Sequence, residues 1–164
     1  MHKQNRQIGK SKKTVKAISE DNNIAIFKEN TKIVKSLFDN YANITFGEND
    51  AIVSDSLKFY PARIANDTLN KTNSLVGLKA FRSLSNKVSY SDLKFLPTVN
   101  DSTYQPDGNV RVFATWTTEG KNGVKITSKY FGIFEFNKDH KVFYIEEYQD
   151  YGGLMLALTT IQKK

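Results

Sequence analysis

The sequence predicts an α+β domain in which two helices precede an antiparallel sheet. Apolar residues recur at helical spacing in two early segments, and they alternate with polar residues along several segments between residues 88 and 150. Because the predicted helices are segregated from most of the strands, an α+β architecture is favoured over an alternating parallel one. The length of 164 residues suits one domain and is short for two.

The first helix is predicted at about residues 23–44. Apolar side chains recur along one side of it, from Ile24 to Tyr41, with a period near that of an α-helix. The residues before it are basic and polar. We expect residues 1–22 to form a flexible N-terminal tail, as chain ends often do, and residues 23–164 to form the folded domain.

A short strand and a second helix are predicted next. Residues 56–60 alternate between polar and apolar side chains, as in a strand. The polar segment 62–73 predicts a loop. The second helix is expected to begin with Asn73 or Ser74 as its N-cap and to end near Asn86.

Four strands joined as a meander are predicted in the second half of the chain. Asn122-Gly123 is typical of a type I′ hairpin turn, and residues 137–140 close the last hairpin. The apolar segment 154–161 is expected to form a terminal tail or helix. The predicted strands lie at residues 89–99, 109–120, 124–136 and 142–149.

One face of the predicted strand 124–136 is expected to pack against the helices. Its even-numbered positions are mostly apolar, whereas its odd-numbered positions carry charged side chains together with Phe131 and Ile133. These two residues form an apolar spot on the outer face. A partner subunit, a loop or the C-terminal segment would cover that spot.

The positive charge of the chain is concentrated near its N-terminus. The net charge is +7, and residues 1–19 carry +6 of it, because they hold six Lys and Arg residues and no acidic residue. The rest of the chain is nearly neutral, which argues against a groove that binds nucleic acid. No apolar run approaches the length of about 18 residues that a membrane-spanning helix needs. We expect a soluble protein, in the cytoplasm or exported by a signal that this sequence does not contain.

Few residues of this sequence suit metal, nucleophilic or acid–base chemistry. The chain has no cysteine and two histidines, His2 in the tail and His140 in a turn, so neither a metal site nor another cofactor is expected. The remaining catalytic candidates are Glu146 and Asp150. Glu146 and Glu147 are adjacent on a strand and point to opposite faces, so that one of them can face inward. Asp150 lies where the strand ends and also suits an N-cap.

Seven aromatic residues fall within the predicted core elements. They form either an ordinary core or the lining of a partly hollow pocket between helices and sheet, with tyrosine hydroxyls as its polar points. The ligand of such a pocket would be a small hydrophobic or aromatic molecule. The candidate lining residues are Tyr41, Phe59, Tyr60, Trp116, Tyr130, Phe134 and Tyr148.

Several segments taken in order carry a family resemblance. The long first helix is followed by segments 53–61, 77–81, 134–142 and 147–154, and the last two are similar to a family ending of the form F-x-F, turn, G-K-I, then D-x-x-x-L. Over about residues 24–158 the chain resembles the nuclear transport factor two-like superfamily in its SnoaL-like branch. The resemblance implies a cone, in which a strongly curved antiparallel or mixed sheet wraps around the helices. It also implies a pocket at the wide end and a homodimer formed through the sheet.

The resemblance does not bring a known catalytic set with it. Ketosteroid isomerase, in this superfamily, has its base just before a proline at the end of the first strand, where this chain has Tyr60. The oxyanion-hole acid of that enzyme corresponds to Gly132. A tyrosine with a pKa of about 10 is a poor base at neutral pH, and glycine supplies no acid. The pocket histidine of the polyketide cyclases and scytalone dehydratase has no counterpart in a predicted helix or strand.

Three functions remain open on this basis. We favour a small-molecule-binding domain with an aromatic pocket and no recognised catalytic set. An enzyme of the isomerase, dehydratase or cyclase type would instead use a non-standard carboxylate such as Glu146, beside Tyr60 or Tyr130, and it requires a buried carboxylate within hydrogen-bond reach of a tyrosine. An interaction module would recruit an anionic partner with its basic tail.

Overall fold

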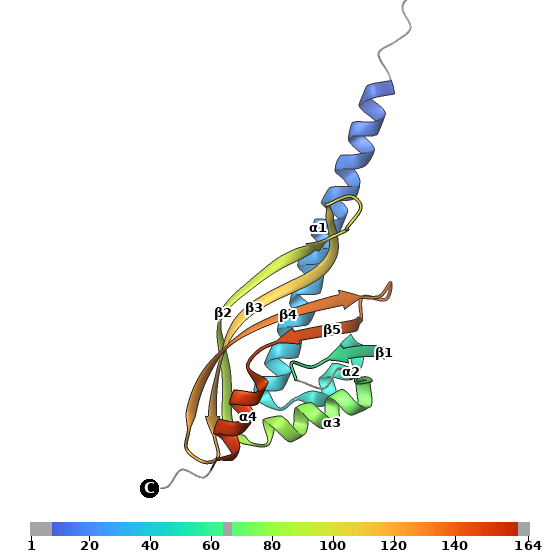
Figure 1. The fold of residues 1–164 in the computed structure, drawn as a ribbon. Helices are drawn as coiled ribbons and strands as arrows, with labels where there is room; N and C mark the ends of the chain where they lie inside the picture. Colours follow the sequence, from blue (N-terminus) through green and yellow to red (C-terminus); the bar gives the residue numbers. More distant parts are fainter. Residues whose placement is uncertain (1–7, 64–66, 161–164) are drawn as a thin grey trace, which may run out of the picture.

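The computed structural model of the chain describes residues 8–63 and 67–160. Within these residues, four α-helices and one short 3₁₀ turn accompany a single five-stranded sheet (Figure 1). In chain order the elements are α1 (Ile8–Asn43), the 3₁₀ turn (Phe46–Glu48), α2 (Asn49–Ile52), β1 (Val53–Tyr60), α3 (Lys71–Arg82), β2 (Ser85–Val99), β3 (Pro106–Gly120), β4 (Lys125–Phe136), β5 (Val142–Tyr148) and α4 (Tyr151–Thr159).

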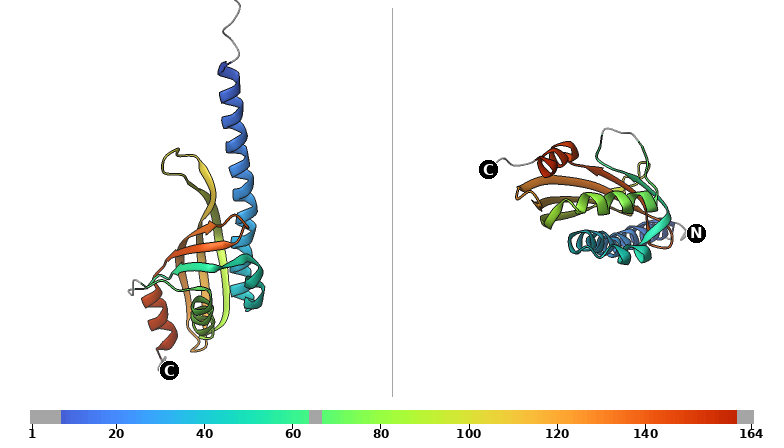
Figure 2. Two further views of the ribbon diagram at one scale, coloured as in Figure 1. Left: turned by 90° about the vertical axis from the view of Figure 1, so that its right-hand side faces the viewer. Right: turned by 90° about the horizontal axis from the view of Figure 1, so that it is seen from below.

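The sheet is mixed, in the strand order β1-β5-β4-β3-β2. Strands β2 to β5 form the predicted antiparallel meander, and β1 joins its edge by pairing parallel with β5. The long strands curve, and α1 lies along the sheet beside them (Figures 1 and 2). The predicted α+β fold with a mixed, curved sheet is therefore confirmed.

Helix α1 begins earlier than the sequence pattern predicted. It is helical from Ile8, and its first turns extend beyond the sheet (Figure 2). Among the side chains that the structure describes, Asn23 attaches α1 to the sheet, because its Nδ2 donates to the carbonyl of Pro106 at 2.8 Å. The buried Asn30 makes a similar bond to Gly108 at 2.9 Å. Residues 1–7 of the expected tail lie outside the described part of the chain.

The inner face of the sheet packs against α1 as predicted. Val34 and Phe38 of α1 are buried against Val110 and Val112 of β3 and against the even-numbered positions of β4. Trp116 joins the same cluster, with its ring centroid 4.9 Å from that of Phe38. This packing fixes which face of every strand in the meander is turned towards the helices.

The outer face of the sheet carries an aromatic patch formed by Phe113, Phe131 and Tyr148. The ring of Phe131 lies 4.8 Å from that of Phe113 and 5.6 Å from that of Tyr148. Phe113 is 43% exposed and Tyr148 is 51% exposed. The predicted apolar spot around Phe131 is thus larger than the sequence indicated, because two neighbouring strands add a ring each.

A buried arginine holds the end of α1 against α3. Arg82 is 4% exposed, and its guanidinium donates to the carbonyls of Tyr41 at 3.3 Å and Ala42 at 3.1 Å, in the last turn of α1. It also donates to the carbonyl of Ser85 at 2.9 Å. Its positive charge therefore sits at the C-terminus of a helix, where the helix dipole favours a cation.

Candidate functional site

A cavity of about 150 Å³ lies between α1, α3 and the inner face of the sheet. Aromatic rings from several elements meet in its walls, and many of them meet edge to face. Phe38 and Tyr130 lie 5.4 Å apart at 87°, and Tyr41 and Trp116 lie 5.6 Å apart at 81°. Such contacts hold the rings in fixed positions, so that the walls are rigid.

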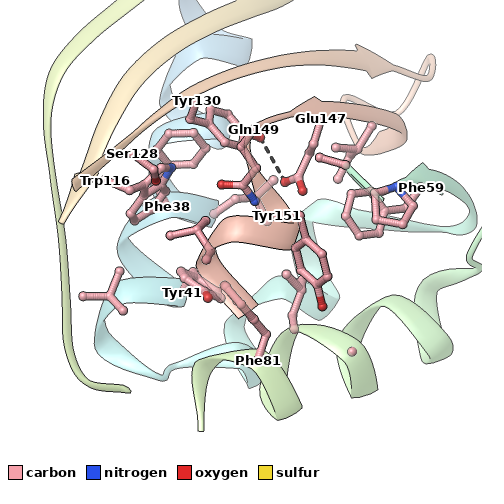
Figure 3. Close-up of a pocket in the computed structure, with 18 of the residues that line it drawn as sticks. Phe38, Tyr41, Phe59, Phe81, Trp116, Ser128, Tyr130, Glu147, Gln149 and Tyr151 are labelled. Carbon is pink, nitrogen blue, oxygen red and sulfur yellow. Dashed lines mark hydrogen bonds between the residues drawn. The ribbon is translucent and has the colours of Figure 1, made fainter. Parts of the chain in front are cut away.

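Glu147 brings a carboxyl group into this apolar cavity. It lies on β5, and Figure 3 shows its side chain directed towards Tyr130 of β4. The Tyr130 hydroxyl donates to Glu147 Oε1 at 3.0 Å. Tyr130 itself is buried, at 5% exposure. The two side chains therefore form a hydrogen-bonded polar pair in a mostly apolar cavity.

Burial controls the protonation of this pair. Removal from water disfavours the charged carboxylate and raises the pKa of Glu147 to about 7, although the hydrogen bond from Tyr130 acts to lower it. Burial also raises the pKa of Tyr130 well above its ordinary value, with the nearby Glu147 charge as a second cause. Tyr130 consequently stays a hydrogen-bond donor, while Glu147 can gain or lose a proton near neutral pH.

Gly132 provides the space in which Tyr130 reaches Glu147. Gly132 is paired with Glu147 across β4 and β5, two residues after Tyr130 on the same face. A Cβ atom at residue 132 would lie 2.5 Å from the Tyr130 hydroxyl oxygen and 2.9 Å from Tyr130 Cε1. The phenol ring therefore lies over the backbone of residue 132. At the position where the resemblance expects an acid, the nearest polar group is the hydroxyl of Tyr130.

Five of the seven predicted pocket aromatics line the cavity. They are Tyr41 from α1, Phe59 from β1, Trp116 from β3, and Tyr130 and Phe134 from β4. Their convergence follows from strand alternation, which turns every second residue of β3 and β4 towards α1.

The structure places Tyr60 and Tyr148 outside the cavity. Both border a wider, open depression beside it. Tyr148 lies on the outer face because it is one residue out of phase with Glu147, and it belongs to the aromatic patch. Tyr60 is likewise one residue out of phase with Phe59, and its ring lies 5.2 Å from that of Tyr144.

The two carboxylates singled out from the sequence also lie away from the cavity, on the border of the same depression. Glu146 accepts hydrogen bonds from the hydroxyls of Tyr144 at 2.9 Å and Tyr148 at 2.5 Å. Asp150 caps α4, since its carboxylate accepts from the backbone N–H of Gly153 at 2.9 Å. The inward carboxylate of the pair 146–147 is therefore Glu147, and not Glu146.

Sequence reasoning missed other parts of the cavity wall. Phe38, Phe81 and Tyr151 add rings from α1, α3 and the start of α4, while Ser128 and Gln149 add uncharged polar groups (Figure 3). Phe38 lies in the predicted helix 23–44, and Phe81 lies in the second predicted helix. The sequence pattern did not indicate that these two rings would line the pocket.

The described residues offer no second centre of chemistry. His140 lies in the β4–β5 turn, with its Nδ1 3.4 Å from Asn30 Oδ1, and His2 lies outside the described residues. Within residues 8–63 and 67–160, no three His, Cys, Asp or Glu side chains cluster as metal ligands would. None of the helices described there is long and apolar enough to cross a membrane.

Comparisons with known proteins find the same fold in solved structures. No protein-family model matches the sequence, and no curated protein matches it. A "Putative Isomerase from Bacillus subtilis" superposes with a TM-score of 0.66 at 9% identity, over 84% of this chain and 99% of that one. A "Putative SnoaL-like polyketide cyclase" from Shewanella denitrificans OS-217 gives a TM-score of 0.62 at 9% identity, over 79% of this chain and 96% of that one.

A third structure, an NTF2-like protein from Burkholderia xenovorans LB400, gives a TM-score of 0.58 at 21% identity, over 80% of this chain and 97% of that one. The chain thus has the fold of the nuclear transport factor two-like proteins. Proteins described as SnoaL-like share this fold, which the sequence resemblance predicted. At these identities the likeness concerns the fold, and function has to be argued from the cavity itself.

Proposed function

We propose that the protein binds a small, mostly apolar molecule in the cavity and that Glu147 and Tyr130 hold its polar group. The observation that carries this proposal is a carboxyl–phenol pair inside an aromatic chamber. Rings supply contact area for an apolar ligand, and a few convergent polar groups fix its orientation. A volume of about 150 Å³ suits a ligand of one six-membered ring.

Ligand binding can be followed through Trp116. This residue is the single tryptophan of the chain and forms part of the cavity wall, so its fluorescence reports on the cavity alone. We would titrate one-ring ligands such as toluene, phenol and cyclohexanone, and measure fluorescence together with thermal stability. We expect at least one of them to quench Trp116 and raise the melting temperature.

A matched pair of variants separates cavity binding from surface binding. Ser128 lines the cavity, whereas Thr127, the preceding residue on β4, is exposed on the other face. Ser128→Leu should fill the cavity and abolish the response, and Thr127→Leu should keep it. Equal responses in the two variants, or no response to any ligand in the wild type, would contradict the proposal.

An acid–base enzyme is a second candidate, favoured by the protonation of Glu147. The enzyme hypothesis requires a buried carboxylate within hydrogen-bond reach of a tyrosine. Glu147 is half-buried and accepts a hydrogen bond from the buried Tyr130, so it comes nearer to this requirement than Glu146. A group with a pKa of about 7 can both accept and return a proton at neutral pH. The reaction class would be proton transfer to and from carbon in a bound molecule, as in an isomerase.

Hydrogen–deuterium exchange tests this second candidate without knowledge of the natural substrate. A one-ring ketone that binds the cavity should exchange its acidic C–H protons in D₂O faster with the protein than without it. Glu147→Gln should remove this acceleration, and Glu146→Gln should retain it. If a ketone binds but its C–H protons do not exchange faster, the enzyme candidate is refuted and the protein is a binding domain.

We also infer a homodimer through the outer face of the sheet. The aromatic patch of Phe113, Phe131 and Tyr148 is an exposed apolar surface of the kind that subunit contacts cover. Phe131→Lys should shift the mass measured by light scattering from dimer to monomer. A wild-type monomer at all concentrations would refute the inference. Recruitment of an anionic partner by the basic tail stays a prediction, since the side chains of residues 1–21 lie outside the described part.

A further inference from the structure

Residue 132 determines whether Tyr130 can reach Glu147. Tyr130 and Glu147 lie on neighbouring strands but are not directly paired, because the register pairs Gly132 with Glu147. A side chain at residue 132 would stand between them on the inner face of the sheet. Only the absence of that side chain lets the phenol lean along β4 and place its hydroxyl against Glu147 Oε1, at 3.0 Å.

The space above residue 132 is filled on two sides. A Cβ atom there would lie 2.5 Å from the hydroxyl oxygen of Tyr130 and 3.0 Å from Phe134 Cε2. Both rings are buried, and both pack against Phe38, at 5.4 Å and 6.3 Å between centroids. Neither ring can therefore retreat without disturbing the cavity wall.

The backbone conformation of Gly132 does not explain why a glycine stands there. The described residues with a positive φ angle do not include it, so an L-residue could adopt its backbone shape. It lies in the middle of a regular β4–β5 pairing, where glycine weakens a strand. The reason for glycine at this position is therefore steric, and it concerns Tyr130.

We propose that Gly132 is a positioning residue, which keeps open the space through which Tyr130 hydrogen-bonds Glu147 and so leaves Glu147 Oε2 as the oxygen presented to a ligand. The proposal rests on the proposed function, because that function supplies the ligand that the Glu147 carboxyl would bind. It goes further in assigning the orientation of the carboxyl to a residue that touches no ligand. It also accounts for the departure from the family pattern, since an acid at residue 132 and the Tyr130–Glu147 pair would exclude each other.

We expect the other titratable groups near Glu147 to keep their positions when residue 132 is changed. Tyr41 of α1 faces Glu147 across the cavity, and Tyr151 lies near Tyr41 at the start of α4. Lys71 Nζ lies 3.4 Å from Asp50 Oδ1, and both residues line a smaller cavity. Glu147 lines that smaller cavity as well. A change in the titration of Glu147 can therefore be attributed to the loss of its Tyr130 contact.

The test measures the titration of the Glu147 carboxyl by ¹³C NMR, with the signal assigned by its loss in Glu147→Gln. Gly132→Ala should displace Tyr130 and raise the pKa of Glu147 by about one unit or more, because a hydrogen bond that favours the charged form is lost. Tyr130→Phe should cause the same rise, and the double variant should show no further rise. Gly77→Ala is the matched control, since Gly77 also lines the cavity but has open space where its Cβ would lie.

A second measurement tests the proposal even if the Gly132→Ala variant does not fold. Where Gly132→Ala prevents folding of the wild-type chain, adding Tyr130→Ala should restore a cooperative urea transition, because the phenol is absent. Where Gly132→Ala folds, its cost in urea unfolding should largely disappear in the Tyr130→Ala background. An unchanged Glu147 pKa in a folded Gly132→Ala variant would overturn the proposal, and so would an equal cost of the substitution in both backgrounds. These measurements use no ligand, so their failure is distinct from a failure to find a ligand for the cavity.

Discussion

The clearest energetic consequence of the site is the contribution of Glu147 to the pH dependence of stability. Folding moves this side chain from water into the cavity and raises its pKa from 4.5 to about 7. Below pH 4.5 the folded and unfolded chains both hold the proton, and the carboxyl carries no penalty. As the pH rises from 4.5 to 7, the unfolded chain releases the proton first, so the free energy of unfolding falls. Above pH 7 both states are ionised and the loss is complete.

The size of this effect follows from the pKa difference. One unit corresponds to about 1.4 kcal/mol, so the change from 4.5 to about 7 lowers the free energy of unfolding by about 3 kcal/mol. Glu147→Gln replaces the carboxyl by a neutral amide of the same shape, which can still accept the hydrogen bond from Tyr130. The variant should match the wild type near pH 4.5 and exceed its stability by about 3 kcal/mol above pH 7.

Urea unfolding followed by circular dichroism, repeated from pH 4.5 to pH 8, measures this difference directly. Subtracting the variant curve from the wild-type curve removes the contributions of the other carboxyls. Glu146→Gln is the control, because this neighbour faces the other side of the sheet, and it should not reproduce the pH-dependent gain of Glu147→Gln. Parallel curves for the wild type and Glu147→Gln would refute the argument that burial controls this carboxyl.

Three other contacts lead to predictions that urea unfolding at neutral pH can test. Arg82→Met leaves three carbonyls without their buried cation and should cost about 3–5 kcal/mol, with Arg82→Lys intermediate; a cost near zero would mean that α1 ends without this anchor. Asp150→Ala removes the N-cap of α4 and should cost about 1 kcal/mol, whereas Asp150→Asn should recover most of it. Asn30→Ala removes the buried bond to Gly108 and should cost about 1–3 kcal/mol. Amide exchange in Asn30→Ala should be faster than in the wild type or unchanged. Slower exchange in β3 would contradict the stabilising role assigned to Asn30.

The fold was predictable because its main elements follow simple periodicities. The alternation in β4 correctly turned Tyr130 and Phe134 inward and Phe131 outward, since a strand buried on one face leaves that signature. The N-cap of the second predicted helix was not predicted correctly from the sequence. Helix α3 begins at Lys71 with Asn70 as its N-cap, rather than at Asn73 or Ser74, because the Asn70 side chain accepts the Asn73 N–H at 2.9 Å.

Strand β5 shows why the decisive carboxylate was not predictable. Its first four residues, Val142 to Ile145, are all apolar or aromatic, so they give no alternation from which to choose between Glu146 and Glu147. The choice is made by the pairing of β5 with β4, which sets Glu147 opposite Gly132. The start of α1 was missed for a related reason, since residues 8–22 carry no regular apolar stripe that periodicity could detect.

The parallel pairing of β1 with β5 also constrains how the chain is made. In the described sheet β1 lies at the edge and has β5 as its strand neighbour, and Val53 pairs with Val142, from the far end of the sequence. A ribosome therefore releases the first strand long before it has synthesised the strand that completes its ladder. Until residues 142–148 emerge, the wall that carries Phe59 has no backbone support from the meander, and the chamber cannot close on that side.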